Sequence, residues 1–220
     1  TLVFTLVIVV LVIMLNTDPN NHKDRIAREF EKSTGLALSL NGSIDLSFYP
    51  WLGITLNDFV IANPPGSSNT PLMQAQQAEL RVKLLPMLDQ EYEIDTIHLT
   101  GARIFLETNA VGESNWDSGA LGTTNSDEAS VSDTTLNKLV VGGVDINNAS
   151  VIFDDQFNDV IYTLENINIS TGELVYGAPI ELSLALDASA SQPDLAALIR
   201  LTGTMVYDLE NQRYDLNPLS

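Results

Sequence analysis

Residues Leu36 to Phe48 read LALSLNGSIDLSF, and this stretch predicts that the body of the protein is built from β-strands. Apolar side chains recur at every second position on both sides of Asn41-Gly42, which is the period of a strand with one buried face. Asn-Gly between two alternating runs is a strong hairpin signal. A three-residue loop, 41–43, would pair Leu40 with Ile44 and keep all the apolar side chains on one face, because a one-residue slip turns a strand over. The predicted face consists of Leu36, Leu38, Leu40, Ile44, Leu46 and Phe48.

Alternation of this kind continues along the chain. It predicts strands near residues 54–62, 72–84, 92–100, 102–108, 180–188, 197–208 and 213–216. Between them, residues 117–136 are mostly Ser, Thr, Gly, Asn and acids, a composition typical of a flexible loop. We therefore expect a mainly β protein with a curved, twisted antiparallel sheet of repeated hairpins.

Two segments of the predicted sheet resemble each other at a constant offset of 47 residues. Residues 94–107 read IDTIHLTGARIFLE, and residues 141–154 read VGGVDINNASVIFD. A weaker echo relates residues 56–61, LNDFVI, to residues 164–169, LENINI. We interpret both as repeats that extend one sheet. The matched positions are Ile94 and Val141, Ile97 and Val144, Leu99 and Ile146, Ala102 and Ala149, Ile104 and Val151, and Leu106 and Phe153.

The apolar face of these strands must be covered, and the sequence leaves two solutions open. A β-sandwich or a closed barrel would cover it with more sheet. A curved sheet could instead leave it as a groove that is filled by an apolar ligand. Alternation alone does not distinguish the two architectures.

Upstream of the strands, residues 2–15 read LVFTLVIVVLVIML, without a charge. Completed by residues before Thr1, this run would be long enough for a transmembrane helix, so we expect a membrane anchor over residues 1–17. A cleaved signal peptide and a buried core segment are the alternatives, although no A-x-A-like cleavage site follows. Residues 18–35 predict a short amphipathic helix, with Asp18 as N-cap, Pro19 in its first turn and Gly35 after its end.

The charge balance limits the classes of partner. The 220 residues carry 10 Lys and Arg against 29 Asp and Glu, a net charge of −19, so nucleic acid is not an expected partner. Four of the cations, Lys23, Arg25, Arg28 and Lys32, follow the predicted anchor. By the positive-inside rule they favour a cytoplasmic location for this flank. Cysteine is absent, which excludes disulfides and thiolate chemistry.

Residues with catalytic or metal-binding potential do not form a recognisable motif. His22 and His98 are the only histidines, neither lies near a nucleophile motif, and we expect both at the surface. Asp154, Asp155 and Asp159 lack the spacing of an EF-hand and predict an acidic turn. We expect no catalytic residues, no metal and no cofactor, and thus not an enzyme.

The order of several short motifs resembles the AsmA family of bacterial envelope proteins. The resemblance covers about the first 116 residues and begins with the apolar anchor and Asp18-Pro19-Asn20. The motifs that follow are Lys32-Ser33-Thr34-Gly35, Phe48-Tyr49-Pro50-Trp51-Leu52-Gly53, Leu56-Asn57-Asp58, Asn63-Pro64-Pro65-Gly66, Ala78-Glu79-Leu80-Arg81-Val82, Leu84-Leu85-Pro86-Met87-Leu88 and Gly112 through Asn115-Trp116.

This resemblance implies a single-pass inner-membrane protein with a periplasmic β-groove that takes part in phospholipid transport to the outer membrane and in envelope integrity. The implied partners are phospholipid acyl chains, the inner membrane and other envelope proteins. The alternative function is an anchored β-sandwich scaffold for outer-membrane protein assembly that binds no lipid. Residues 36–116 and 137–220 would form two segments of the groove. Its expected lining is Leu80, Val82, Leu84, Ile97, Leu99, Ile104, Leu106, Val144, Ile146, Val151 and Phe153.

Overall fold

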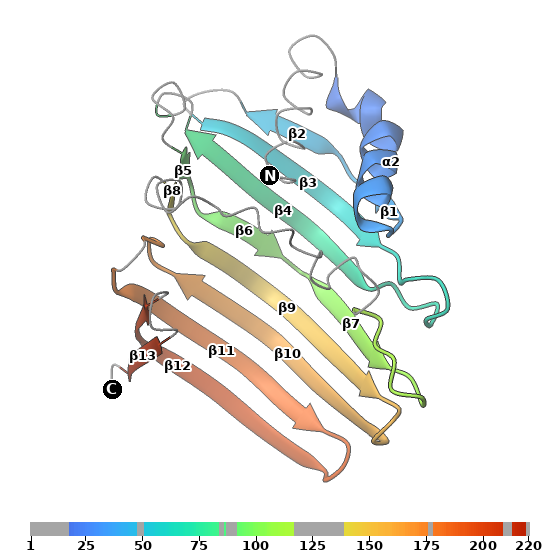
Figure 1. Cartoon of the computed structure of the whole chain (residues 1–220). Coiled ribbons are helices and arrows are strands. Elements are labelled where there is room, and N and C mark those ends of the chain that lie inside the picture. Colours follow the sequence, from blue (N-terminus) through green and yellow to red (C-terminus); the bar gives the residue numbers. More distant parts are fainter. Residues whose placement is uncertain are drawn as a thin grey trace.

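The computed structural model describes residues 18–47, 51–83, 86, 92–116, 139–175, 178–208 and 213–218. In this part of the chain all strands belong to one 13-stranded sheet, and a helix lies along its first edge (Figure 1). The prediction of a mainly β protein is confirmed. The predicted anchor, residues 1–17, and the predicted loop, residues 117–136, lie outside the described residues. Among the described helices, none has the length and apolar character needed to cross a membrane.

The helical segment begins with the 3-10 helix η1 (Pro19–His22) and continues as α2 (Lys23–Thr34). As predicted, Asp18 is the N-cap, and its side chain accepts a hydrogen bond from the backbone N–H of Asn20. This bond holds the pKa of the exposed Asp18 carboxyl below its usual value. Gly35 ends α2 in the left-handed conformation, which its lack of a Cβ permits, and its N–H donates to the carbonyl of Glu31.

The segment that opens the sheet does not form the predicted hairpin. Strands β1 (Leu38–Leu40) and β2 (Ile44–Ser47) both pair with β3 (Trp51–Ile61) and not with each other. The N–H groups of Asn41 and Gly42 donate to the carbonyl of Asp58, so Asn-Gly links two strands that lie end to end. A Cβ on Gly42 would lie 2.4 Å from the backbone oxygen of Asn57, and therefore only glycine fits. The described part of the predicted face survives this correction, because Leu40 lies opposite Phe59 and Ile44 opposite Leu56, whereas Phe48 lies outside the described residues.

The middle of the sheet corrects the prediction of a purely antiparallel arrangement. Strand β4 (Met73–Lys83) is antiparallel to β3, and it pairs on its other side with β5 (Tyr92–Ile94), β6 (Ile97–Thr100) and β7 (Arg103–Thr108). These short strands run parallel to β8 (Leu139–Val141) and β9 (Val144–Asp155). The reason is the repeat, since the two related segments lie side by side in the same direction. Each position of one is the partner of the position 47 residues later, as in Ile97 with Val144 and Leu106 with Phe153.

The sheet continues in antiparallel order through β10 (Val160–Thr171), β11 (Ile180–Ala190), β12 (Leu195–Asp208) and β13 (Arg213–Pro218). The described strands make their main contacts with hydrogen-bonded neighbours, and α2 packs on β1. In the described part of the chain the sheet is thus one layer, and the two facing sheets of the sandwich alternative are not seen. Both predicted groove segments contribute to this layer.

Candidate functional site

The residues predicted to line a groove lie on one face of the sheet, which we call the apolar face. Strand register places Ile97 beside Val144, Leu99 beside Ile146, Ile104 beside Val151, and Leu106 beside Phe153. Leu80 and Val82 extend this face on β4, opposite Ile54 and Leu52 of β3. Leu84 lies outside the described residues. The other ten side chains are half-buried.

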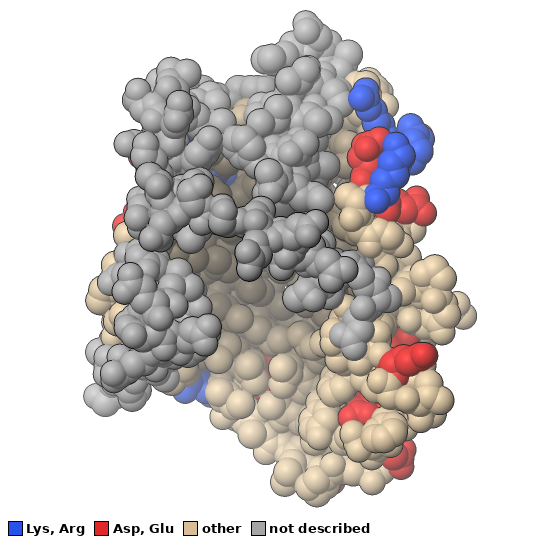
Figure 2. All heavy atoms as spheres, viewed as in Figure 1, with Lys and Arg blue, Asp and Glu red and all other residues tan. Residues whose placement is uncertain are grey.

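Half-burial is the informative property of this face. A second protein layer would bury such side chains almost completely, as in the interior of a sandwich. Figure 2 shows the molecule in the view of Figure 1, with a hollowed surface that carries few charged side chains where tan atoms are visible. The Lys and Arg side chains of α2 gather at the margin of this view.

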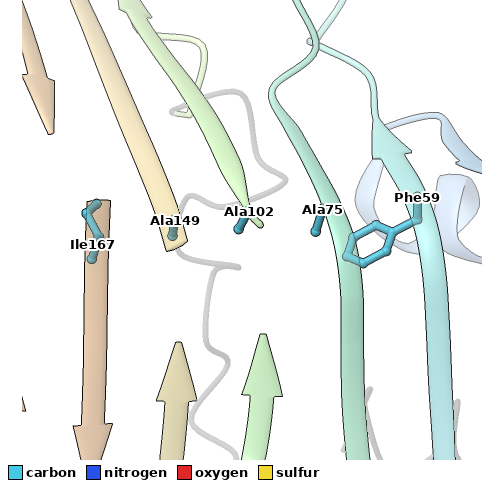
Figure 3. Close-up of a cluster of buried hydrophobic side chains, with 5 residues drawn as sticks. All are labelled: Phe59, Ala75, Ala102, Ala149 and Ile167. Atoms are coloured by element: carbon cyan, nitrogen blue, oxygen red, sulfur yellow. The ribbon is translucent and has the colours of Figure 1, made fainter. Parts of the chain in front are cut away.

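The deepest part of the apolar face is a row of five side chains that the sequence analysis did not select. These residues, the apolar row, come from five neighbouring strand segments, and Figure 3 shows them side by side. Phe59 lies opposite Ala75, and Ala149 lies opposite Ile167. Ala102 stands between these pairs and is 0% exposed. The apolar row consists of Phe59, Ala75, Ala102, Ala149 and Ile167.

Partly buried apolar side chains, all but Ala78 larger than alanine, flank the apolar row on both sides. On one side lie Leu56, Ala78, Leu99, Ile146 and Ile169, and on the other lie Ile61, Met73, Val151 and Leu164. Ile104, the register partner of Val151, extends the second side. The row and its flanking side chains form one apolar band that crosses the strands. We call this band the apolar trough, the row its floor and the flanking side chains its walls.

The trough lies where strand alternation is interrupted. Within each strand segment the flanking and row residues are three positions apart, as in Leu56 and Phe59 or Ile146 and Ala149, so one extra residue intervenes. In four of the five segments this residue has left-handed backbone torsion angles, with φ of 43°, 62°, 52° and 52°. We call these residues the bulge row. They are Asp58, Gly101, Asn148 and Asn166.

The opposite face of the sheet is polar at the same level. Asn57 donates through its side chain to Asp45 and accepts from Gln77. Asn166 donates to the carboxylate of Asp187 at 2.6 Å. His98 contacts Asp145 on the outer face, with 3.3 Å between Nδ1 and Oδ2, and both side chains are partly exposed, in line with the predicted surface location of this histidine.

Aromatic rings extend the apolar face beyond the trough. Phe153 stacks on Tyr162 of the neighbouring strand, with 5.9 Å between ring centroids, and Trp116 meets Phe153 edge to face at 5.4 Å. Such pairs prefer these geometries. The set of side chains that could contact an alkyl chain thus includes Trp116 and Tyr162.

Two of the family-like motifs meet at the end of β7. The side chain of Asn115 donates to Asn63 at 2.8 Å, and Asn63 donates to the buried carboxylate of Glu107. The N–H of Ser68 donates to the same Glu107 oxygen at 2.7 Å. A polar cavity of about 750 Å³ lies beside this network, lined also by Gly112 and Gln156. Each of these polar groups has a hydrogen-bond partner within the network, so we interpret the network as a structural connection between two loops.

Catalytic or metal-binding geometry is not seen in the described part of the chain. No group of three or more His, Cys, Asp or Glu residues there is arranged to hold a metal ion. The acidic turn after β9 is organised internally, because Asp155 accepts from both the N–H and the side chain of Asn158. This matches the predicted acidic turn.

The described fold defines a class of protein: a single-layer β-sheet with a helix at one edge, one apolar trough and no second layer over it. The comparison of sequences then gives the family. The model of the AsmA family matches residues 1–206, and the chain belongs to that family. It is 32% identical to Protein AsmA of Escherichia coli (strain K12) over 118 residues. That alignment covers 50% of this chain and 18% of the length of the relative.

Proposed function

We propose that this protein is a bacterial envelope protein whose apolar trough shields lipid acyl chains, as part of phospholipid transport between the inner and outer membranes. Residues 1–17 would anchor it in the inner membrane, with the sheet in the periplasm. Membership of the AsmA family supports the envelope assignment. The observation that carries the proposal is the half-buried apolar face of a one-layer sheet.

The physical role of such a face is to lower the cost of removing a lipid from a bilayer. Each CH₂ group transferred from an apolar environment to water costs about 0.8 kcal/mol, so a two-chain lipid does not leave a membrane readily. Leu99, Ile146 and their neighbours supply apolar contacts for an alkyl chain, while the open side leaves the polar head group in water. No reaction is needed, and the proposed mechanism is passive.

Native mass spectrometry of the full chain, extracted in mild detergent, tests the proposal directly. We expect bound phospholipid on the wild type and its loss in the double variant Leu99→Asp with Ile146→Asp, which places two charges at neighbouring positions of the trough wall. The matched control is Thr100→Asp with Asn147→Asp, because these two residues are register partners on the polar face. Equal lipid in both double variants, with sheet content retained, would contradict the proposal.

A second measurement does not require the protein to fold with charged side chains in the trough. A photoreactive amino acid at Leu99, Ile104 or Ile146 should crosslink to phospholipid in membranes, whereas the same group at Asn147 should not. Crosslinking that is equal on the two faces would argue against a lipid-binding face.

A further inference from the structure

We propose that the bulge row is what gives the trough its depth, so that Asp58, Gly101, Asn148 and Asn166 are positioning residues for the bound lipid. This inference rests on the proposed function. It starts from a shared level in the sheet: the four left-handed residues lie in β3, between β6 and β7, in β9 and in β10, and each directly precedes a member of the apolar row, whereas β4, between β3 and β6, has none. A β-bulge bends its strand and increases the local twist. The register shifts at this level in the pairings of β10, and the left-handed residues of the other strands lie at the same level, so together they would add up to one crease across the sheet.

Burial along the crease supports this interpretation. On a flat one-layer sheet, an alanine is covered only by its immediate neighbours on the same face. Ala75, Ala102 and Ala149 are nevertheless only 5%, 0% and 6% exposed. Bending toward the apolar side brings the larger flanking side chains over them, which makes a floor and two walls.

The sequence carries a shared signal in the four segments that hold the bulge row. A repeated pattern of apolar residue, any residue, then Asp, Asn or Gly, then apolar residue occupies all four places. Asp, Asn and Gly are the residue types that accept left-handed torsion angles with least strain, whereas β-branched residues do so rarely. The four copies are Leu56-Asn57-Asp58-Phe59, Leu99-Thr100-Gly101-Ala102, Ile146-Asn147-Asn148-Ala149 and Leu164-Glu165-Asn166-Ile167.

Polar side chains on the outer face provide hydrogen-bond partners for backbone groups of the bulge row. A bulge removes backbone groups from the regular ladder, and these groups need other partners. The N–H of Asn148 donates to the side-chain oxygen of Asn168 at 3.1 Å. The amide of Asn168 in turn donates to the carbonyl of Asn166 at 2.7 Å. All of these bonds use the polar side, which leaves the apolar side free for a guest.

The trough should consequently hold an acyl chain across the strands, along the apolar row. Neighbouring strands lie about 4.8 Å apart, so the four steps from Phe59 to Ile167 span roughly 19 Å. The crease ends after β10. In β11 the apolar residues Leu184, Leu186 and Ala188 keep strict alternation, opposite Ile169 at one end and Leu164 at the other.

The test replaces bulge residues and compares bound phospholipid per protein by native mass spectrometry. Asn148→Val with Asn166→Val should lower it at least twofold, because valine resists the left-handed conformation and flattens the crease. Asn148→Gly with Asn166→Gly should retain the wild-type amount. The matched control is Asn147→Val, since Asn147 is the exposed neighbour of Asn148. A milder variant, Asn148→Ala, keeps the test open if the valine pair does not fold, and should bind less lipid than Asn148→Gly.

A distance measurement separates bending from general stability. The chain has no cysteine, so spin labels can be attached to introduced cysteines at Ile161 and Ser170, on the outer face of β10 on either side of Asn166. Straightening by Asn166→Val should shorten their separation, and Asn166→Gly should restore it. If the wild type binds no lipid, the proposed function fails. If the wild type binds lipid and the valine or alanine variants, folded, bind as much, the bulge row does not position it.

Discussion

The creased part of the sheet, β3 to β10, and the hairpin formed by β11 and β12 are built from similar alternating strands but differ sharply in burial. In the creased part, Ala102 is 0% exposed and Phe59 is 7% exposed. On the apolar face of the hairpin, Leu195 is 60% and Ile199 is 42% exposed, and the described side chains of residues 191–200 are all exposed. Both regions have one layer and an apolar face. The bulge row is present in the first region, and no described residue of the hairpin has a left-handed φ.

The comparison teaches that a one-layer sheet obtains a core by bending. A hydrophobic side chain is stabilised in proportion to the apolar area removed from water, and in a flat sheet only its neighbours on the same face can remove it. A crease brings side chains three residues apart, such as Leu99 and Ala102, into the same small volume. The face is then stable enough to persist without a second layer, yet open enough for a guest.

The most direct test of this difference is to replace one alanine in each region by a larger residue. Ala102→Leu should destabilise the protein by about 2 kcal/mol, because the extra methyl and methylene groups have no space on the floor of the crease. Ala197→Leu should change stability by no more than about 0.5 kcal/mol. Ala197 is an apt control, since it lies on the same face, opposite Ala188, and is exposed. Urea unfolding of the two full-length variants measures the difference.

Equal destabilisation by the two substitutions would mean that the crease is not the special feature. It would assign the low exposure of Ala102 to its immediate neighbours and not to the bend.

Sequence reasoning identified the apolar face of the sheet but not which strands pair with one another. Alternation within each strand states which side chains share a face, and the repeat placed Leu99 with Ile146 and Ile104 with Val151, as the strand register has them. It does not state which strand pairs with which. Asn41-Gly42 was read as a hairpin turn because that dipeptide suits tight turns, whereas in the structure its N–H groups bind the carbonyl of Asp58. The carbonyl that they bind belongs to a distant strand, which local reasoning did not consider.

The bulge row also has a signal in the sequence, which a search for strict alternation does not detect. Apolar residues three apart interrupt the period of two at Leu56 and Phe59, and again at Leu164 and Ile167. The weak echo between residues 56–61 and 164–169 was this signal, since its Asp58 and Asn166 are both left-handed. The constant offset of 47 likewise contained the parallel pairing, because only parallel neighbours keep a constant difference in residue number.

The next prediction concerns how the creased part is held at its first edge. Asn20 binds both backbone groups of Ile44, donating to its carbonyl at 3.1 Å and accepting from its N–H at 2.9 Å. Asn20→Ala should cost roughly 1–2 kcal/mol, since two partly buried hydrogen bonds are lost and Ile44 is 1% exposed. Thermal unfolding of the variant beside Asn21→Ala, whose side chain is exposed, measures the effect. A loss no larger than that of the control would show that η1 is not clamped to β2.

The smallest expected effect is the pH dependence of the same edge. The N–H of Asn20 lowers the pKa of Asp18, so the folded state favours the ionised carboxylate. A group whose pKa is lowered by folding stabilises the folded state above its usual pKa, 3.8 for this carboxyl, and the stabilisation is lost as the pH falls through the folded value. Asp18→Asn keeps an oxygen acceptor without titrating. The wild type should therefore exceed this variant in stability at neutral pH, and the difference should shrink in acid below pH 3.8.

The unfolding midpoints of both proteins over that pH range measure this difference. Glu29, whose pKa is also lowered by its contact with Lys32, is the same in both proteins and does not contribute to the difference. A difference that stays constant with pH would mean that the Asp18 charge does not contribute, and that the cap acts through its oxygen alone.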